Sequence, residues 1–297
     1  MAVQRYLGAA WASAHGPTDP TRLLRWLLEA RFRGLVPGPA LRAIDWSALA
    51  ASAHDLPISF PAVRASSILS EKSSTAGIAS SRDADQKLAA LAVDQAVLLA
   101  HQVGARVVIV EPGVVPLLGE VGPEDLGDAS ITWTETRAQA LVARAKAGRA
   151  AALDAACRAL FSYCKAHPEF TFCLTPGRSL RALASPETLA AIFEDLGNKR
   201  VAYWHDTAMV GRREQVLGEP QGRWLDDFSN RCVGCTLGDA RPDGVYLPPG
   251  AGGVDYPLLT SYLRRAHKAV PVVLELDPAV AGGELPGVRA CLEKFGL

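Results

Sequence analysis

Three acidic residues each end a short apolar run of this sequence. Glu111 follows RVVIV, Asp206 follows VAYWH and Glu275 follows VPVVL. If these runs are parallel strands, their carboxyl ends meet at one edge of a sheet and the three carboxylates converge there. Such a group suits either oxygen ligation of a hard divalent cation or proton transfer by a carboxylate acid/base pair. For any one acid alone, a salt bridge or a helix cap is the alternative.

Other polar residues follow predicted strands at the same edge. Arg64 and Arg241 carry the planar donors that hold an anionic group bidentately, although a plain surface arginine is the alternative. His205 adjoins Asp206, and because side chains alternate along a strand only one of them can face the site. We expect Asp206 to face inward and His205 to pack between strand and helix. The predicted substrate-binding set is Trp11, His15, Arg64, His205, Asp239 and Arg241.

The elements that must position these residues alternate between strand and helix. Short apolar runs predict strands, the first over residues 5–12, and amphipathic stretches between them predict helices. Capping signals at Asp19-Pro20, Ser185-Pro186-Glu187 and Asp255 mark helix starts. About eight strands, each followed by a helix, favour a single α/β domain over residues 1–297, a (β/α)8 TIM barrel. An open doubly wound sheet is the alternative, but the first strand lacks its usual glycine-rich phosphate loop.

The segments between the strands include one long predicted helix and two long predicted loops. Residues 86–103 have a strong helical pattern, which ends at Gly104. The residues on its apolar side are Leu88, Leu91, Ala92, Leu98, Leu99 and Val103. Residues 66–83 and 114–134 are predicted to be long connections, and loops of this kind serve either as lids over a site or as plain surface loops.

Composition excludes several classes of protein. Lys+Arg and Asp+Glu are both 31, so the formal net charge is zero. The sequence has no basic block interleaved with aromatic residues, so it does not predict a nucleic-acid interface. Because the sequence has neither the pattern of a signal peptide nor an apolar run that could span a membrane, we expect a cytoplasmic protein with no membrane partner. The oligomeric state stays open, a homo-oligomer included.

The six cysteines are expected to be free thiols, since nothing in the sequence indicates secretion. Cys232-x-x-Cys235 resembles half of a zinc site, but no second pair follows it. On a strand, residues three apart point to opposite faces. We therefore expect neither a metal site nor a disulfide at these two residues.

Several segments occur in an order that resembles a known family. They are VVIVEPG at 107–113, PETL at 186–189, VAYWHDT at 201–207, GCTLGDA at 234–240, PGAGGVDY at 249–256 and VVLEL at 272–276. Together they look like the xylose isomerase-like TIM barrels, the superfamily of sugar phosphate isomerases and epimerases and of endonuclease IV. The resemblance covers essentially the whole chain, most clearly residues 85–277. It implies a small-molecule polyol, sugar or sugar phosphate as the substrate.

The resemblance also implies a metal site, which this chain has altered. The family typically holds a divalent metal on a Glu, an Asp, a His and a second Glu from four successive strands. Asp206 and Glu275 match two of these positions, whereas Thr175 and Thr236 stand where the family has the first Glu and the His. Threonine hydroxyls are poor replacements as metal ligands. With Glu111 as a substitute, the expected ligands are Asp206, Glu275 and Glu111, which would hold Mg²⁺ or Mn²⁺ weakly and no tight zinc.

The resemblance and the paired carboxylates together predict a sugar or sugar-phosphate isomerase or epimerase. In its family the two glutamates exchange the substrate proton, and here Glu275 and Glu111 would transfer a proton next to a carbonyl. The alternative is a non-catalytic ligand-binding or pathway-accessory barrel that has lost its metal site. A metal-independent isomerase or lyase is the third hypothesis.

Overall fold

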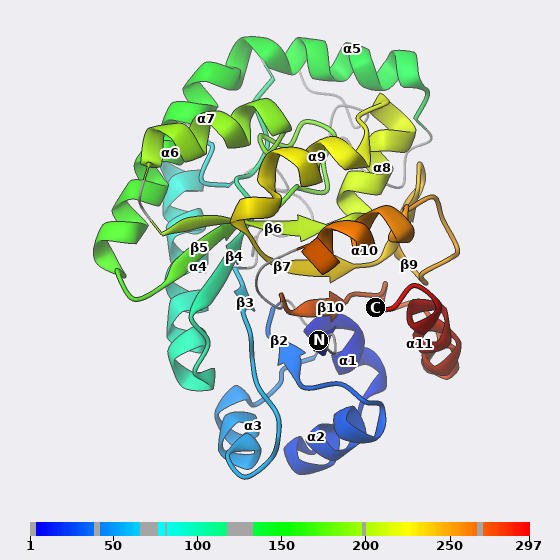
Figure 1. Ribbon diagram of the computed structural model, residues 1–297. Helices are drawn as coiled ribbons and strands as arrows, with labels where there is room; N and C mark the ends of the chain where they lie inside the picture. The colour runs from blue at the N-terminus through cyan, green and yellow to red at the C-terminus, as the bar shows by residue number, and fades with distance from the viewer. Residues whose placement is uncertain are drawn as a thin grey trace.

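The computed structural model describes residues 4–38, 42–65, 77–80, 82–117, 133–197, 200–265 and 270–297. Among these residues, eight parallel strands in the order β2-β1-β10-β7-β6-β5-β4-β3 curl into a nearly closed barrel, with helices around its outside (Figure 1). The predicted TIM-barrel fold is confirmed. Most of the two predicted long connections, at 66–83 and 114–134, lies outside the described residues.

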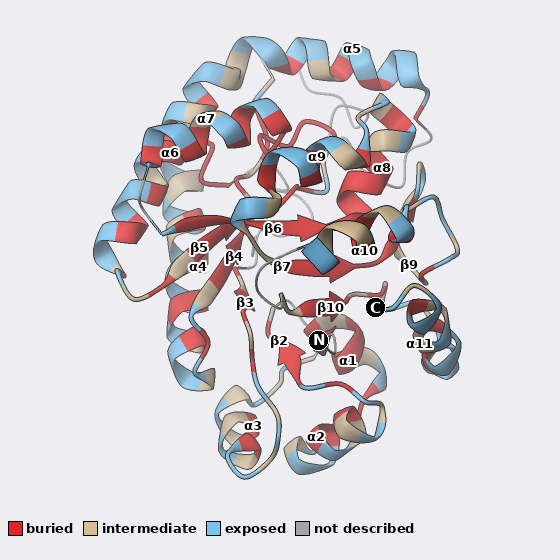
Figure 2. Cartoon of the chain, in the orientation of Figure 1, coloured by how far each residue is buried: buried red, intermediate tan, exposed pale blue. Residues whose placement is uncertain are grey.

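The strands of the barrel are short, and most of their residues are buried (Figure 2). The interior is filled by side chains of alternating strand positions, such as Ile109, Cys173 and Trp204. The bounds are β1 Arg5–Gly8, β2 Leu35–Val36, β3 Val63–Arg64, β4 Val107–Val110, β5 Thr171–Leu174, β6 Val201–Asp206, β7 Cys232–Leu237 and β10 Val272–Leu274.

The ring of strands closes between β2 and β3. These two strands form no ladder in the described structure. Two backbone hydrogen bonds join their neighbourhoods instead: the Ser59 N–H donates to the Arg33 carbonyl at 2.8 Å, and the Arg64 N–H donates to the Pro37 carbonyl at 2.8 Å. Among the described residues, this seam is therefore closed by single backbone bonds instead of a ladder.

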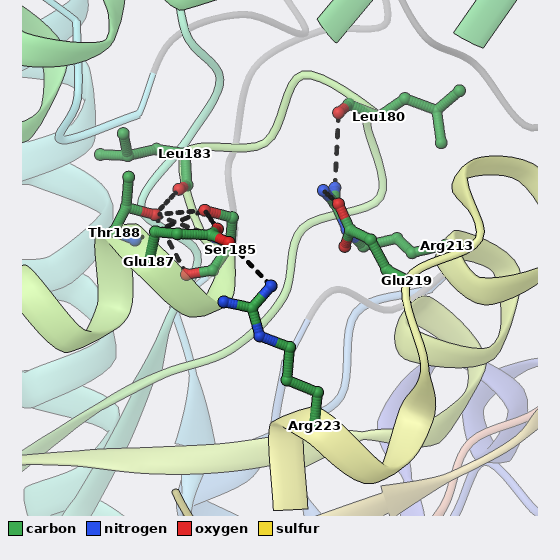
Figure 3. Close-up of polar contacts among 8 residues, drawn as sticks. All are labelled: Leu180, Leu183, Ser185, Glu187, Thr188, Arg213, Glu219 and Arg223. Carbon is green, nitrogen blue, oxygen red and sulfur yellow. Dashed lines mark hydrogen bonds and ion pairs between the residues drawn. The ribbon is translucent and has the colours of Figure 1, made fainter. Parts of the chain in front are cut away.

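The helices begin where the capping signals predict. Asp19 accepts a hydrogen bond from the Arg22 N–H, and Asp255 accepts one from the Leu258 N–H. Ser185 and Thr188 form a reciprocal capping box (Figure 3). No helix in the described ranges is long and apolar enough to cross a membrane. The helix bounds are α1 Ala9–His15, α2 Pro20–Glu29, α3 Trp46–Ala53, α4 Asp83–Val103, α5 Glu135–Ala145, α6 Arg149–Ala166, α7 Pro186–Leu196, α8 Thr207–Leu217, α9 Gln221–Phe228, α10 Tyr256–Arg265 and α11 Leu285–Lys294.

The first strand is shorter than predicted. It ends at Gly8, and the segment AAWASAH that follows forms α1. Four of its seven residues are alanine, the strongest helix former, so the apolar run continues as helix once the strand has left the sheet. Trp11 and His15 therefore lie on a helix and not at a strand end.

The apolar side predicted for α4 is only partly correct. Ala92 is buried, and Leu99 and Val103 pack partly buried against the core. Leu88, Leu91 and Leu98, however, are 45%, 53% and 64% exposed, and alanines take the positions that face the barrel. Small side chains such as Ala92 and Ala96 let the helix lie close to the barrel, and this close packing decides which side faces inward.

A short antiparallel hairpin, which was not predicted, follows β7. Its strands are β8 Asp239–Arg241 and β9 Gly244–Leu247. Pro242 and Asp243 form the turn between them, and Gly244 begins β9; the dipeptide Asp243-Gly244 is a sequence signal typical of hairpins. The hairpin takes Asp239 and Arg241 away from the end of the barrel strand, where the sequence had placed them.

Candidate active site

A cavity of about 410 Å³ opens at the carboxyl ends of the barrel strands. Glycines, alanines and prolines supply much of its wall, so the polar groups in it stand out. Those polar residues are Arg64, Glu111, Arg178, Ser179, Tyr246, Glu275 and Asp277. The cavity is of the size of a small-molecule site.

Glu111 and Glu275 reach this cavity from opposite sides of the barrel. Glu111 follows β4 and Glu275 follows β10, and β5, β6 and β7 lie between these strands in the sheet. On the other side of the ring, β1, β2 and β3 separate them. In an eight-membered ring this is the largest possible separation. A molecule bound in the middle of the cavity would thus have one carboxyl group on each side.

Burial sets the protonation of both carboxyl groups. It raises the pKa of Glu275 to about 7, against the opposing attraction of Arg64. Burial also raises the pKa of Glu111, again opposed by Arg64. The Glu275 carboxylate lies directly against Gly8, because a Cβ atom on Gly8 would be 1.9 Å from Glu275 Oε2. Only glycine at this position leaves room for the carboxylate where it stands.

The guanidinium of Arg64 lies among the acidic groups. Its Nη1 is 3.7 Å from Glu111 Oε1, and its Nη2 is 3.6 Å from Asp206 Oδ2. Nη2 also donates a hydrogen bond to Thr236 Oγ1 at 3.2 Å. Burial alone would lower the pKa of Arg64, but the acidic groups around it, Tyr246 first and Asp206 next, raise that pKa overall. The guanidinium therefore carries a permanent positive charge in the site.

Asp206 lies beneath the cavity and is fully buried. Its Oδ1 accepts the Met209 N–H at 3.2 Å, so the residue caps α8, while its Oδ2 accepts the Tyr246 hydroxyl at 3.0 Å. Burial raises the pKa of Asp206, and Arg64 opposes that rise. The Asp206 carboxylate thus contacts Arg64, Tyr246 and the first turn of α8.

The two threonines do not make a metal site. Thr236 Oγ1 accepts hydrogen bonds from Arg64 and from Trp204 Nε1, the latter at 2.9 Å, so its lone pairs are already used. Thr175 Oγ1 is buried and has no hydrogen-bond partner within the described chain. No three His, Cys, Asp or Glu side chains of the described residues are grouped so that they could hold a metal ion. With Arg64 between Glu111 and Asp206, the residues present do not fit a divalent metal.

Two buried arginines on α8 hold the loop that forms one wall of the cavity. Arg212 Nη1 donates to the Arg178 carbonyl at 2.9 Å. Arg213 forms two bonds with Glu219, at 2.7 and 2.9 Å, and its Nη1 donates to the Leu180 carbonyl at 3.4 Å (Figure 3). The wall between β5 and α7 is therefore fixed to the helix that Asp206 caps.

Glu111, Glu275 and Arg64 line the cavity, and Asp206 contacts Arg64 from below. The other predicted residues lie elsewhere. Asp239 accepts hydrogen bonds from the backbone of residues 250 and 254, and Arg241 Nε donates to the carbonyl of residue 251. Both therefore hold the glycine-rich loop in place instead of lining the cavity.

Trp11, His15 and His205 also lie outside the cavity lining. Trp11 is buried, and its Nε1 donates to the Val280 carbonyl at 2.9 Å. His15 Nε2 is 2.8 Å from the Pro278 carbonyl. His205 points away from the cavity, and its Nδ1 lies 2.9 Å from the Tyr203 hydroxyl. Burial lowers the pKa of His205 to about 3, so this imidazole is neutral.

Tyr246 is one of the cavity residues that sequence reasoning missed, with Ser179 and Asp277. It lies on β9 with a φ of 60°, a left-handed backbone that tyrosine rarely adopts. Its carbonyl accepts the Asp277 N–H at 2.9 Å, which ties the hairpin to the chain after β10. The hairpin signal Asp243-Gly244 would have placed a second strand here, and with it a tyrosine at the barrel mouth.

No protein-family model and no curated protein matches the chain, whereas solved structures match its fold over almost its whole length. A D-tagatose 3-epimerase-like protein is 14% identical, with 98% of this chain and 96% of that chain covered and a TM-score of 0.70. The 3-keto-D-glucoside 4-epimerase from E. coli is 13% identical, covering 99% and 98%, with a TM-score of 0.64. An AP endonuclease, family 2, from Brucella melitensis is 14% identical, covering 99% and 98%, with a TM-score of 0.64. At these identities the likeness establishes the fold alone, a TIM barrel shared with these solved structures.

Proposed function

We propose that this protein is an isomerase or epimerase that moves a proton at a carbon next to a carbonyl in a sugar, a sugar phosphate or a related polyol. The observation that carries the proposal is the pair Glu111 and Glu275, two carboxyl groups with raised pKa values on opposite sides of one cavity. A proton removed on one face and returned on the other inverts the carbon between them. Solved epimerases of the same fold support this assignment.

Glu275 acts as the general base in this scheme. Its carboxylate takes the proton, the electron pair of the broken C–H bond moves into the C–C bond, and the carbonyl oxygen becomes an enediolate oxygen. Arg64 faces this oxygen and stabilises its charge. Glu111 starts protonated in this scheme, a form that burial favours by raising its pKa, and gives its proton to the other face of the carbon. Exchange with water then resets both carboxyl groups.

The proposal predicts exchange of a carbon-bound proton with solvent. We would incubate the protein in D₂O with ketohexoses, D-tagatose and D-psicose among them, and with ketohexose phosphates. Loss of the C3 proton signal would be followed by NMR. Glu275→Gln should lower the exchange rate by at least about 10²-fold, since general base catalysis contributes on the order of 10² to 10⁴. Glu29→Gln, at an exposed position on α2, is the matched control and should leave the rate unchanged.

The alternative is the non-catalytic ligand-binding barrel, which the loss of two family metal ligands at Thr175 and Thr236 favours. Saturation-transfer NMR with the same sugars separates the two functions. If wild type and Glu275→Gln both bind sugar and neither exchanges the C3 proton, the ligand-binding alternative is established. The proposal that the protein is an isomerase or epimerase is then refuted.

A further inference from the structure

We propose that the guanidinium of Arg64 is the built-in cation of this site, standing at the ligand positions that the family resemblance assigns to a divalent metal, so that the protein works without one. The part of the inference that concerns the reaction rests on the proposed function. The part that concerns metal binding does not, because it follows from the residues around Arg64 alone.

Arg64 contacts residues at the family's ligand positions. Asp206 and Thr236, two of these positions, lie 3.6 and 3.2 Å from its Nη2. Glu275, a third, is near enough for its charge to act on the guanidinium. On the other side, Nη1 is 3.7 Å from Glu111. The guanidinium thus reaches the acids that a metal would need as ligands.

The backbone holds Arg64 in this position. Its N–H donates to the Pro37 carbonyl at 2.8 Å, across the seam of the barrel. Gly38 packs on the start of its side chain, since a Cβ atom on Gly38 would be 3.2 Å from Arg64 Cβ. The side chain is only 14% exposed. The cation is therefore placed before any substrate arrives.

A guanidinium can do the electrostatic work expected of a metal in this reaction. It is planar, remains charged at every working pH, and presents donors in a fork that matches neighbouring oxygen atoms. A carbonyl oxygen that becomes negative would find a fixed positive charge beside it. The same charge also repels a divalent ion from the carboxylates around it. A chain that places arginine here therefore has no need of the His and Glu ligands, and Thr236 and Thr175 stand in their places.

The test measures Mn²⁺ affinity on the full chain, purified without chelator, by water-proton relaxation and EPR. Wild type should bind Mn²⁺ no more tightly than about 1 mM and carry less than about a tenth of a metal ion per chain. Arg64→Gln should bind Mn²⁺ at least about tenfold more tightly, because the carboxylates lose their internal cation. The matched control is Arg178→Gln, which removes an exposed arginine from the same cavity; its charge also acts on Glu111 but is screened by solvent, so the affinity should rise by less than about threefold.

Restoring the family ligands gives a second comparison. The double variant Thr175→Glu, Thr236→His should bind Mn²⁺ less than about threefold more tightly than wild type while Arg64 is present. Adding Arg64→Gln to it should raise the Mn²⁺ affinity by at least about a further tenfold. Three results would each overturn the inference: one tightly held metal per chain in wild type, no gain for Arg64→Gln over Arg178→Gln, or tight binding by the double variant with Arg64 intact. If Arg64→Gln does not fold, as thermal unfolding would show, the wild-type affinity decides alone, and a Kd below about 100 μM refutes the inference. These affinities are independent of the sugar exchange, so each proposal can fail without the other.

Discussion

Replacing Glu275 by glutamine should stabilise the fold at high pH and leave its stability at low pH unchanged. Burial raises the pKa of Glu275 in the folded protein from its usual 4.5 to about 7. Between these two values the folded protein holds a proton that the unfolded chain releases. Stability therefore falls as the pH rises through this window. Glutamine has the shape of the protonated acid and carries no charge, so it avoids this loss.

The expected size of the effect follows from the two pKa values. The gap between 4.5 and about 7 corresponds to about 3 kcal/mol, which wild type has lost by pH 8. Glu275→Gln should therefore be more stable than wild type by about 3 kcal/mol at pH 8, and equal to it at pH 4, where both side chains are neutral. The ionised Glu275 carboxylate, which the proposed reaction needs, would thus destabilise the fold.

Urea unfolding at several pH values between 4 and 8 measures this difference directly, with the slope m as a check that the unfolded states agree. Glu29→Gln is again the control, and as a change at an exposed position it should shift stability by less than about 0.5 kcal/mol at every pH. A Glu275→Gln variant that is less stable than wild type at pH 8 would show that the ionised carboxylate is stabilised in the fold. The reasoning on Glu275 as a base of raised pKa would then be refuted.

Further predictions concern other parts of the molecule. Burial lowers the pKa of His205 to about 3, so its imidazole should not titrate above about pH 4 by NMR. The unfolded chain protonates this imidazole from about pH 6.5 downward, so the free energy of unfolding should fall by about 5 kcal/mol by pH 3. Glu219→Gln should lower the free energy of unfolding by about 3 kcal/mol, since Arg213 stays buried with its charge uncompensated; an unchanged urea midpoint would contradict this. Gly8→Ala should reduce sugar proton exchange at least about tenfold, because the added methyl group displaces the Glu275 carboxylate, and equal rates would disprove that contact. Thiol titration of the denatured, unreduced protein should find all six cysteines free, and four would reveal a disulfide.

The sequence was sufficient to place the acids of the site. Glu111, Asp206 and Glu275 each follow a short apolar run, and parallel strands bring such residues to one rim whatever the details of packing. Helix starts were equally local, since a cap such as Asp255 acts on backbone groups only three residues away. Features that depend on a few neighbouring residues were therefore predicted correctly.

What the sequence did not predict depended on contacts between distant segments. Arg64 was expected to bind an anionic group of the substrate, but its pairing with the acids at the carboxyl ends of β4 and β6 was not predicted. Nothing near residue 64 in the sequence reports on those partners. Leu91 faces solvent because alanines pack α4 closely on the barrel. Tyr246 is an exception, since a local turn signal was present and only its consequence was missed.

The seam between β2 and β3 links the integrity of the barrel to the charge of its site. One of the two bonds across it comes from the backbone of Arg64. Local opening of a fold starts where few hydrogen bonds hold it, so we expect the sheet to open at this seam, which has no ladder in the described structure. Each opening would break the Arg64 bond and withdraw the guanidinium from Glu111 and Asp206. Amide hydrogen exchange at residue 64 should then report how often the site loses its cation, and a ligand that bridges the guanidinium and the carboxylates would slow that exchange.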